Sequence, residues 1–456
     1  MTRHPQLPQS KPLRLHRPIL FWLLALALIR GIIYASLMPP WQAPDEPAQF
    51  ERVRASLTAV DWNSTSENGP GWYDDLIRSL FAFGFWDFLD DARPIYEPDA
   101  PLNRYIGPYQ EIYGGLYGSR PTFALMGWPL FLVRNQDITL QLYLVRLNTV
   151  LMNVGIVGLA FLIVRAIFPQ DMFLVVGVPS LVLFNPQHTH LLSTVNNGNL
   201  AELLTAAALY LMVKGIMEGF NWRIGSAVAG LSLVAMWTKA TAYFLPVVIG
   251  CIALFQLWRY HRHWRWLLPI GLTIVGLIFY LVPQRLWLLM SEAQAGLRTG
   301  AIYLDPIVPL DLFRSFWAMP GWTIFLLPHF WYWILAAACL FALVGLTILL
   351  ITRRHLFFSR KYQPQIQALV VLAIAAIVAI SILLGWNALT QSITYRQGRS
   401  LYPASVPISL FLVLGWRQLI PYSWRAVALL LFTGLFFLFD TLVLFGFIVP
   451  FFYSRY

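Results

Sequence analysis

Two adjacent acids, Asp45 and Glu46, are the residues whose types and placement best suit chemistry. They stand between Pro44 and Pro47, directly after the first long apolar run of the chain. Proline fixes its own backbone and restricts the residue before it, so both carboxylates are kept out of a regular helix. We predict that both acids are catalytic, because a restrained carboxylate can act as a general base toward a hydroxyl. A divalent cation at the pair is left open, and the alternative is a solvated turn.

Three more residues are predicted to contact a substrate near the acids. Gln49 and Arg52 follow one helical turn onward, and we expect them to face the same cleft. Lys239 lies at the end of a predicted span, where a lysine either snorkels to the interface or binds phosphate.

The segment 391–403 contributes two arginines, Arg396 and Arg399, and a tyrosine, Tyr402. A guanidinium grips phosphate oxygens through paired hydrogen bonds. We therefore predict that this segment binds a phosphate or pyrophosphate. The alternative is that the arginines pair with acids of the loop that follows the first span.

A run of asparagines begins another predicted helix. Asn196, Asn197 and Asn199 carry amides that can hydrogen-bond sugar hydroxyls. We predict that these three side chains bind substrate.

Other polar residues lie within or beside predicted spans. His188 and His190 are two positions apart, so they do not share a helical face and no metal site is predicted from them. Glu202, Arg30 and Asp440 are expected to be paired or functional, since a lone charge in lipid is costly. Asp440 could neutralise either Arg30 or the lysine named above.

The composition indicates an integral membrane protein. The chain has 456 residues, of which 58% are hydrophobic and 12% are charged. Repeated apolar runs of about 20 residues can each cross a bilayer as a helix. The net charge of +11 comes mostly from Lys and Arg in short turns, where they set orientation, so no nucleic-acid partner is predicted.

We predict an all-α bundle of about eleven transmembrane helices, with residues 1–456 forming a single membrane domain. The basic segment 1–18 is expected in the cytoplasm, and the loops 39–140 and 284–327 outside, together with the C-terminus. The short apolar segment 122–133 is expected not to cross, because crossing would move the basic turns outside. The expected membrane is the bacterial plasma membrane. The spans are predicted near residues 19–38, 142–168, 172–190, 199–215, 224–238, 241–258, 266–283, 328–351, 365–385, 401–416 and 426–447.

The first long loop differs in charge from the rest of the chain, with 14 acidic and 7 basic residues between 39 and 140. Within it, the segment 74–91 places apolar side chains at helical spacing and acids on much of the opposite side. We predict a helix that lies in the membrane interface. Its apolar positions are Ile77, Leu80, Phe81, Phe85 and Phe88.

Three short motifs resemble those of the DUF2142 family of polytopic membrane proteins. Residues 44–50 (PDEPAQF) are similar to the signature PDEPAHF, and residues 397–404 (QGRSLYPA) to the GRYLFPA segment. Residues 195–200 (VNNGNL) resemble the NND turn. The chain has Gln49 where the signature has His, and Ser400 where the second motif has an aromatic residue.

This resemblance implies membership of the wider GT-C superfamily of polytopic glycosyltransferases. That superfamily has an acidic motif and interfacial helices in its first outer loop, and uses polyprenyl-phosphate sugar donors. The resemblance makes Asp45 the candidate base, Glu46 its neighbour and Arg399 a phosphate contact.

The leading hypothesis is a membrane glycosyltransferase that moves a sugar from a polyprenyl-phosphate donor to an extracytoplasmic glycan, lipid or protein. Asp45 would deprotonate the acceptor, and the arginines and lysine would stabilise the phosphate leaving group. One alternative is a transporter or flippase of lipid-linked or anionic solutes, which predicts charges along a central path and similar halves. Another is an inactive scaffold in envelope-glycan assembly, suggested by the two departures from the family motifs.

Overall fold

The computed structural model describes residues 16–57, 71–88, 97, 100–113, 121–259, 304–321, 325–359, 361–390 and 396–454. Within these ranges every regular element is helical and no strand occurs. The predicted all-α class is confirmed for this part of the chain.

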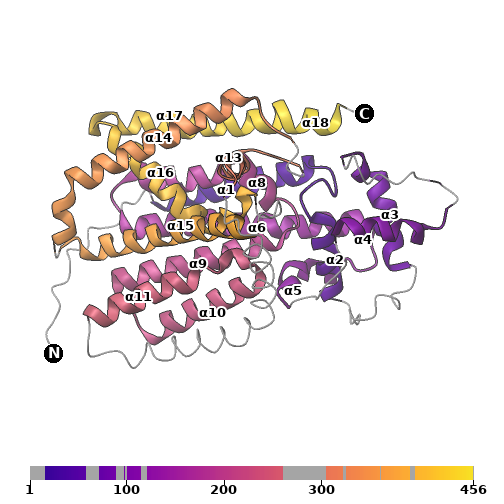
Figure 1. The fold of residues 1–456 in the computed structure, drawn as a ribbon, viewed down its shortest axis with the longest axis horizontal. Coiled ribbons are helices and arrows are strands. Elements are labelled where there is room, and N and C mark those ends of the chain that lie inside the picture. The colour runs from indigo at the N-terminus through magenta and orange to yellow at the C-terminus, as the bar shows by residue number, and fades with distance from the viewer. Residues whose placement is uncertain are drawn as a thin grey trace.

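Six helical segments of the described residues are long and apolar enough to cross a membrane. In Figure 1, α6, α9, α15 and α17 run in a common direction through the bundle. The last segment is continuous, with a single π-helical turn (η10) between two α-helices. The six are α1 (His16–Leu37), α6 (Ile138–Ile167), α9 (Asn197–Glu218), α14 (His329–Thr352), α15 (Gln363–Thr390) and Tyr422–Tyr453, which comprises η9 (Tyr422–Trp424), α17 (Arg425–Leu442), η10 (Val443–Ile448) and α18 (Val449–Tyr453).

Shorter helices occupy other predicted spans. The predicted span 172–190 is divided in two, because Asn185 caps a new helix and Pro186 occupies its first position. The predicted span 266–283 lies outside the described residues, so the count of eleven stays a prediction. These shorter helices are α7 (Met172–Leu183), α8 (Pro186–Leu192), α10 (Trp222–Thr238), α11 (Leu245–Arg259) and α16 (Ser405–Leu419).

Small residues let two helices of the bundle touch through their backbones. A Cβ on Gly345 of α14 would lie 2.0 Å from the carbonyl oxygen of Gly415 in α16. A Cβ on Gly415 would lie equally close to the carbonyl of Ala342, 2.0 Å away. Close backbone approach of this kind is a common basis for helix association in membranes.

The elements between α1 and α6 form a cap at one end of the bundle (Figure 1). The cap forms a hydrophobic cluster together with residues of α6 and of the start of α9, and Trp41 and Phe50 are buried in it. A short 3-10 helix, η4 (Ala240–Ala242), separately joins α10 to α11. The cap comprises α2 (Glu46–Ser56), α3 (Gly71–Ala82), η1 (Phe85–Phe88), η2 (Leu102–Tyr105), α4 (Ile106–Tyr113), α5 (Pro121–Gly127) and η3 (Trp128–Leu132).

The helix predicted for the membrane interface belongs to this cap. Within residues 74–88, α3 and η1 bury Ile77, Leu80 and Phe85 completely against the cap cluster. Its apolar face is therefore covered by protein, and the amphipathic pattern reflects packing within the cap, not contact with lipid. Residues 89–91 of the predicted helix lie outside the described residues.

The short apolar segment before α6 is shorter than a membrane-spanning helix. Its elements α5 and η3 together extend only from Pro121 to Leu132, whereas a crossing needs about 20 residues. Leu125, Trp128 and Leu132 expose 51–75% of their surface. That the segment stays on one side of the membrane is still a prediction.

Candidate functional site

The turn after α1 sends the two adjacent acids in different directions. Asp45 has a left-handed backbone (φ 63°), which aspartate tolerates better than most residues. Trp41 shares this conformation (φ 72°), held by complete burial and a 2.9 Å hydrogen bond from its indole N–H to Ser79. As a result, the Asp45 side chain is 41% exposed, whereas that of Glu46 is 0% exposed.

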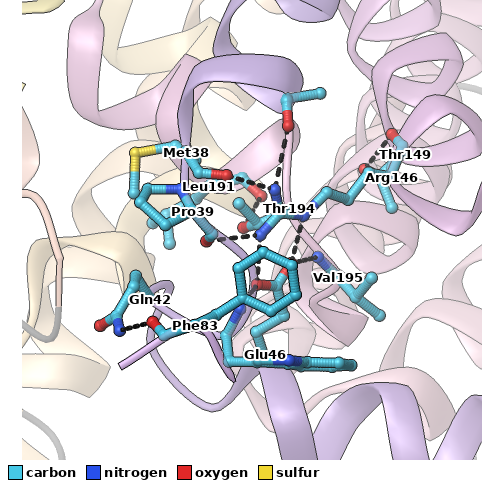
Figure 2. Close-up of polar contacts among 12 residues, drawn as sticks. Met38, Pro39, Gln42, Glu46, Phe83, Arg146, Thr149, Leu191, Thr194 and Val195 are labelled. Carbon is cyan, nitrogen blue, oxygen red and sulfur yellow. Dashed lines mark hydrogen bonds and ion pairs between the residues drawn. The ribbon is translucent and has the colours of Figure 1, made fainter. Parts of the chain in front are cut away.

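Both carboxylate oxygens of Glu46 form a buried ion pair with Arg146 of α6. Arg146 donates from Nη2 to Oε2 at 2.6 Å and from Nε to Oε1 at 2.8 Å (Figure 2). The backbone N–H groups of Trp41 and Val195 donate two more hydrogen bonds to this carboxylate, at 3.1 and 3.0 Å. A carboxylate offers about four acceptor positions, so Glu46 has none left for a substrate proton. This geometry favours a positioning role over the predicted catalytic one.

Arg146 also secures the end of α1. Its Nη1 donates to the carbonyls of Ala35 (2.9 Å) and Met38 (2.6 Å), and its Nη2 to that of Pro39 (3.0 Å). The last carbonyls of a helix lack hydrogen-bond donors within the helix, and here the Arg146 guanidinium supplies these donors. We call Glu46 and Arg146 with these contacts the Glu46–Arg146 node. It fixes the residue before Glu46 and the residue after Val195, which are Asp45 and Asn196.

Four predicted site residues meet beside this node. Arg399 Nη2 lies 2.8 Å from Asp45 Oδ2, and its Nη1 lies 3.5 Å from the Pro44 carbonyl. Lys239 Nζ donates to Asn196 Oδ1 at 3.2 Å. It lies close enough to Asp45 and Arg399 for both charges to act on its pKa. We call Asp45, Asn196, Lys239 and Arg399 the polar site. When Lys239 is protonated, two cations lie near one carboxylate, and the polar site then carries a net positive charge.

Lys239 occupies an unusual electrostatic environment at the turn between α10 and η4. Burial, followed by the Arg399 guanidinium, lowers the pKa of Lys239 to about 7, although Asp45 and Glu202 act in the opposite direction. Gly198 leaves room for it, since a Cβ there would lie 2.9 Å from Nζ. An anion bound between Lys239 and Arg399 would relieve their mutual repulsion.

Arg399 is held in place by the helix η8 (Gly398–Ala404), which packs on α13 (Ile307–Trp317). The N–H of Gly398 donates to Ser315 Oγ at 2.7 Å, and a Cβ on Gly398 would lie 2.3 Å from the Phe316 nitrogen. Tyr402 is buried and donates its hydroxyl to the Phe316 carbonyl at 3.0 Å. Tyr402 therefore positions η8, a different use from the predicted substrate contact.

A buried polar cluster lies beneath the polar site. Glu202, 2% exposed, accepts a 2.6 Å hydrogen bond from Ser405 Oγ through Oε1. The same oxygen lies 2.7 Å from His188 Nε2. This cluster ties α8, α9 and the start of α16 together. Glu202 is thus paired, as expected of an acid inside a span.

The remaining predicted residues take up other positions. Arg396 pairs with Asp305 at 3.4 Å, away from the polar site's carboxylate. Asn197 donates its amide to the Thr238 carbonyl at 3.2 Å. Asn199 donates its amide to the carbonyls of Leu191 (3.1 Å) and Thr194 (2.8 Å), which fixes the backbone before α9.

Gln49 and Arg52 lie on the α2 helix that begins beside Asp45. Gln49 is 7% exposed and its Oε1 has no hydrogen-bond partner, and the buried Nε of Arg52 likewise has none. Unsatisfied buried polar atoms are uncommon and call for a physical explanation.

Deeper in the bundle, Arg30 of α1 pairs with Asp440 of α17 through two nitrogens. Tyr34 donates to the same carboxylate at 2.7 Å, and Arg30 also contacts Thr189. Arg30, not Lys239, is therefore the partner of Asp440.

Arg146 is the residue that sequence reasoning missed. The signal was present, because it is an arginine about one turn into a predicted span, where charge is costly and usually paired. For metals, the described residues contain no group of three or more His, Cys, Asp or Glu side chains arranged to bind an ion.

Comparison with models of protein families, with characterised proteins and with solved structures gives no match for this chain. The resemblance to the DUF2142 family therefore rests on its three short motifs.

Proposed function

We propose that this protein is a membrane glycosyltransferase that takes a sugar from a polyprenyl-phosphate donor and passes it to an extracytoplasmic acceptor. The observation that carries the proposal is the polar site. Four segments far apart in the sequence bring one half-exposed carboxylate, two cations and one amide together. This set contains a base and a phosphate-binding pair, which the reaction requires.

In the proposed reaction, the acceptor hydroxyl oxygen forms a bond to C1 of the donor sugar while the bond from C1 to the phosphate oxygen breaks. Asp45 takes the hydroxyl proton, which its exposure then allows to pass to water. Arg399 and Lys239 stabilise the charge that develops on the leaving polyprenyl phosphate. Arg399 must exchange Asp45 for the phosphate, so binding of the donor frees the base.

The proposed orientation places the cap and the polar site outside the membrane, with the N-terminus in the cytoplasm and the C-terminus outside. Support comes from the positive-inside distribution of the basic turns. The proposed location is the bacterial plasma membrane, in the pathway that builds a surface glycan. Membership of the GT-C superfamily is part of the same proposal.

The test is a transfer assay on membranes that contain equal amounts of protein, with labelled polyprenyl-phosphate sugars as donors. Wild type is compared with Asp45→Asn and with the control Asp74→Asn. Asp74 is a half-buried acid of the cap for which no side-chain partner is seen in the described structure. We expect transfer by wild type and the control, and a loss of at least about 100-fold in Asp45→Asn. Equal transfer by all three would rule out Asp45 as the base.

A further inference from the structure

The α2 helix carries a polar stripe that continues from the polar site. Asp45, Gln49 and Arg52 are separated by four and three residues, so they lie on one face of the helix. The N–H of Gln49 donates to the Asp45 carbonyl at 2.9 Å, which places Gln49 one turn above the proposed base. Phe50 and Val53 of the same helix belong to the buried core of the cap.

The atoms of this stripe lack the partners that similar atoms have elsewhere in the cap. Gln49 is 93% buried, as its 7% exposure shows, yet its Oε1 accepts no hydrogen bond. Arg52 is half-buried, its Nε is unpaired, and it forms no ion pair with a carboxylate of the described residues. By contrast, Arg54 of the same helix holds Asp75 at 2.8 and 3.1 Å. A buried acceptor and an unneutralised guanidinium side by side form an incomplete polar surface.

We propose that this stripe of α2 is the acceptor subsite, and that it selects acceptors carrying an anionic group next to the hydroxyl that Asp45 deprotonates. The inference rests on the proposed transferase function and adds the chemical class of the acceptor. Gln49 hydrogen-bonds a hydroxyl of the acceptor, and Arg52 pairs with its carboxylate or phosphate.

The spacing of the stripe limits the size of the acceptor group that it recognises. Seven residues of helix separate Asp45 from Arg52, a rise of about 10 Å. Helical side chains lean toward the N-terminus, so the long Arg52 side chain shortens this gap. A hydroxyl and an acid on the same sugar, or on adjoining sugars, match the remaining distance.

Binding by purified wild-type protein in detergent tests the charge preference without turnover. The probes are methyl β-glucoside, methyl β-glucuronide and methyl β-glucoside 6-phosphate, which differ only at C6. We expect one or both charged probes to bind at least about 10-fold more tightly than the glucoside, since a charge-assisted hydrogen bond contributes about 1.5–3 kcal/mol. Comparison of the carboxylate and the phosphate probes identifies which anion is preferred. Equal affinity for all three would overturn the proposal.

Variants of the stripe test whether its residues cause the preference for charged probes. Arg52→Gln should bind the glucuronide no more tightly than the glucoside, whereas Arg78→Gln, at an exposed arginine of α3, should behave as wild type. Gln49→Leu should weaken all three probes similarly and keep the preference for charge. A preference that persists in Arg52→Gln would contradict the assignment.

Transfer kinetics separate this inference from the proposed function. With a charged acceptor, Arg52→Gln should raise KM by about 10-fold or more and leave kcat nearly unchanged, because Arg52 contributes uniform binding. Equal transfer to neutral and charged acceptors by wild type would overturn the acceptor subsite and leave the transferase proposal intact. Charge-selective binding without transfer to any acceptor would contradict the transferase proposal instead.

Discussion

Asp45 and Glu46 are neighbours in the chain but occupy opposite environments. Glu46 is wholly buried and accepts four hydrogen bonds, two of them from Arg146. Asp45 is 41% exposed and faces one arginine at 2.8 Å. We interpret this difference as two roles: Glu46 holds the turn after α1 in place, and Asp45 is the proposed base.

The largest effect is expected from breaking the Glu46–Arg146 node. Arg146→Met leaves a buried carboxylate unpaired and removes the donors to three carbonyls at the end of α1. Removing one partner of a buried ion pair costs about 3–5 kcal/mol, so we expect most of the folded protein to be lost. The melting temperature in detergent and the yield of folded protein measure this loss of stability. A variant as stable as wild type would show that the node does not hold the fold.

The second largest effect is expected from a substitution of Asp45, which should reduce activity and leave the fold intact. Asp45→Asn is expected to reduce sugar transfer by about 100- to 10,000-fold, because it removes the proposed general base. Its melting temperature should stay near that of wild type, since half-exposed ion pairs contribute about 0–1 kcal/mol. A large drop in stability together with activity would place Asp45 in the same structural class as Glu46.

A smaller effect is expected in the buried cluster beneath the polar site. Glu202→Gln weakens the hydrogen bonds to Ser405 and His188 and should lower the free energy of unfolding by about 1–3 kcal/mol. The matched control is Glu218→Gln in the last turn of the same helix, where the acid is exposed. It should change stability by less than about 0.5 kcal/mol. Equal effects of the two substitutions would mean that Glu202 does not tie these helices together.

The smallest effect is a pH dependence set by Lys239. Its pKa of about 7 means that the ammonium form predominates below pH 7 and is lost above it. Anion binding stabilises the charged form, so affinity for a polyprenyl-phosphate sugar, whose phosphodiester keeps a single charge in this range, should fall as the pH rises from 6 to 8. The expected loss is about 10-fold by proton linkage. Lys239→Arg should bind nearly independently of pH in this range, because arginine stays charged. An unchanged slope in that variant would assign the titration to another group.

The fold class and part of the polar site followed from the sequence for clear physical reasons. Apolar runs of bilayer length predict helices, and the chain after α1 must turn because of Pro44 and Pro47. The helix start at Asn196 was also expected. Asp45, Lys239 and Arg399 were each selected from residue type and position, and they do meet in the structure.

The rest depended on tertiary contacts that no local pattern encodes. Glu46 and Arg146 are 100 residues apart, so the chain alone does not show that they pair. Tyr402 resembled a ligand contact, but its hydroxyl serves the Phe316 carbonyl. The amphipathic pattern of α3 predicted lipid as the partner of its apolar face, whereas that face is buried in a cluster that the cap forms with α6 and the start of α9.

The central claim is that residues 45 and 399 meet at an outward-facing site, and a cross-linking measurement tests it most directly. Asp45→Cys and Arg399→Cys are combined in a chain whose two native cysteines, Cys251 and Cys339, are replaced by alanine. Intact cells are treated with a short, membrane-impermeant bifunctional thiol reagent, and the joined peptides are identified by mass spectrometry. We predict efficient cross-linking of the two positions from the outside. Labelling of position 45 only after the cells are opened, or labelling of both positions without cross-linking, would contradict the claim.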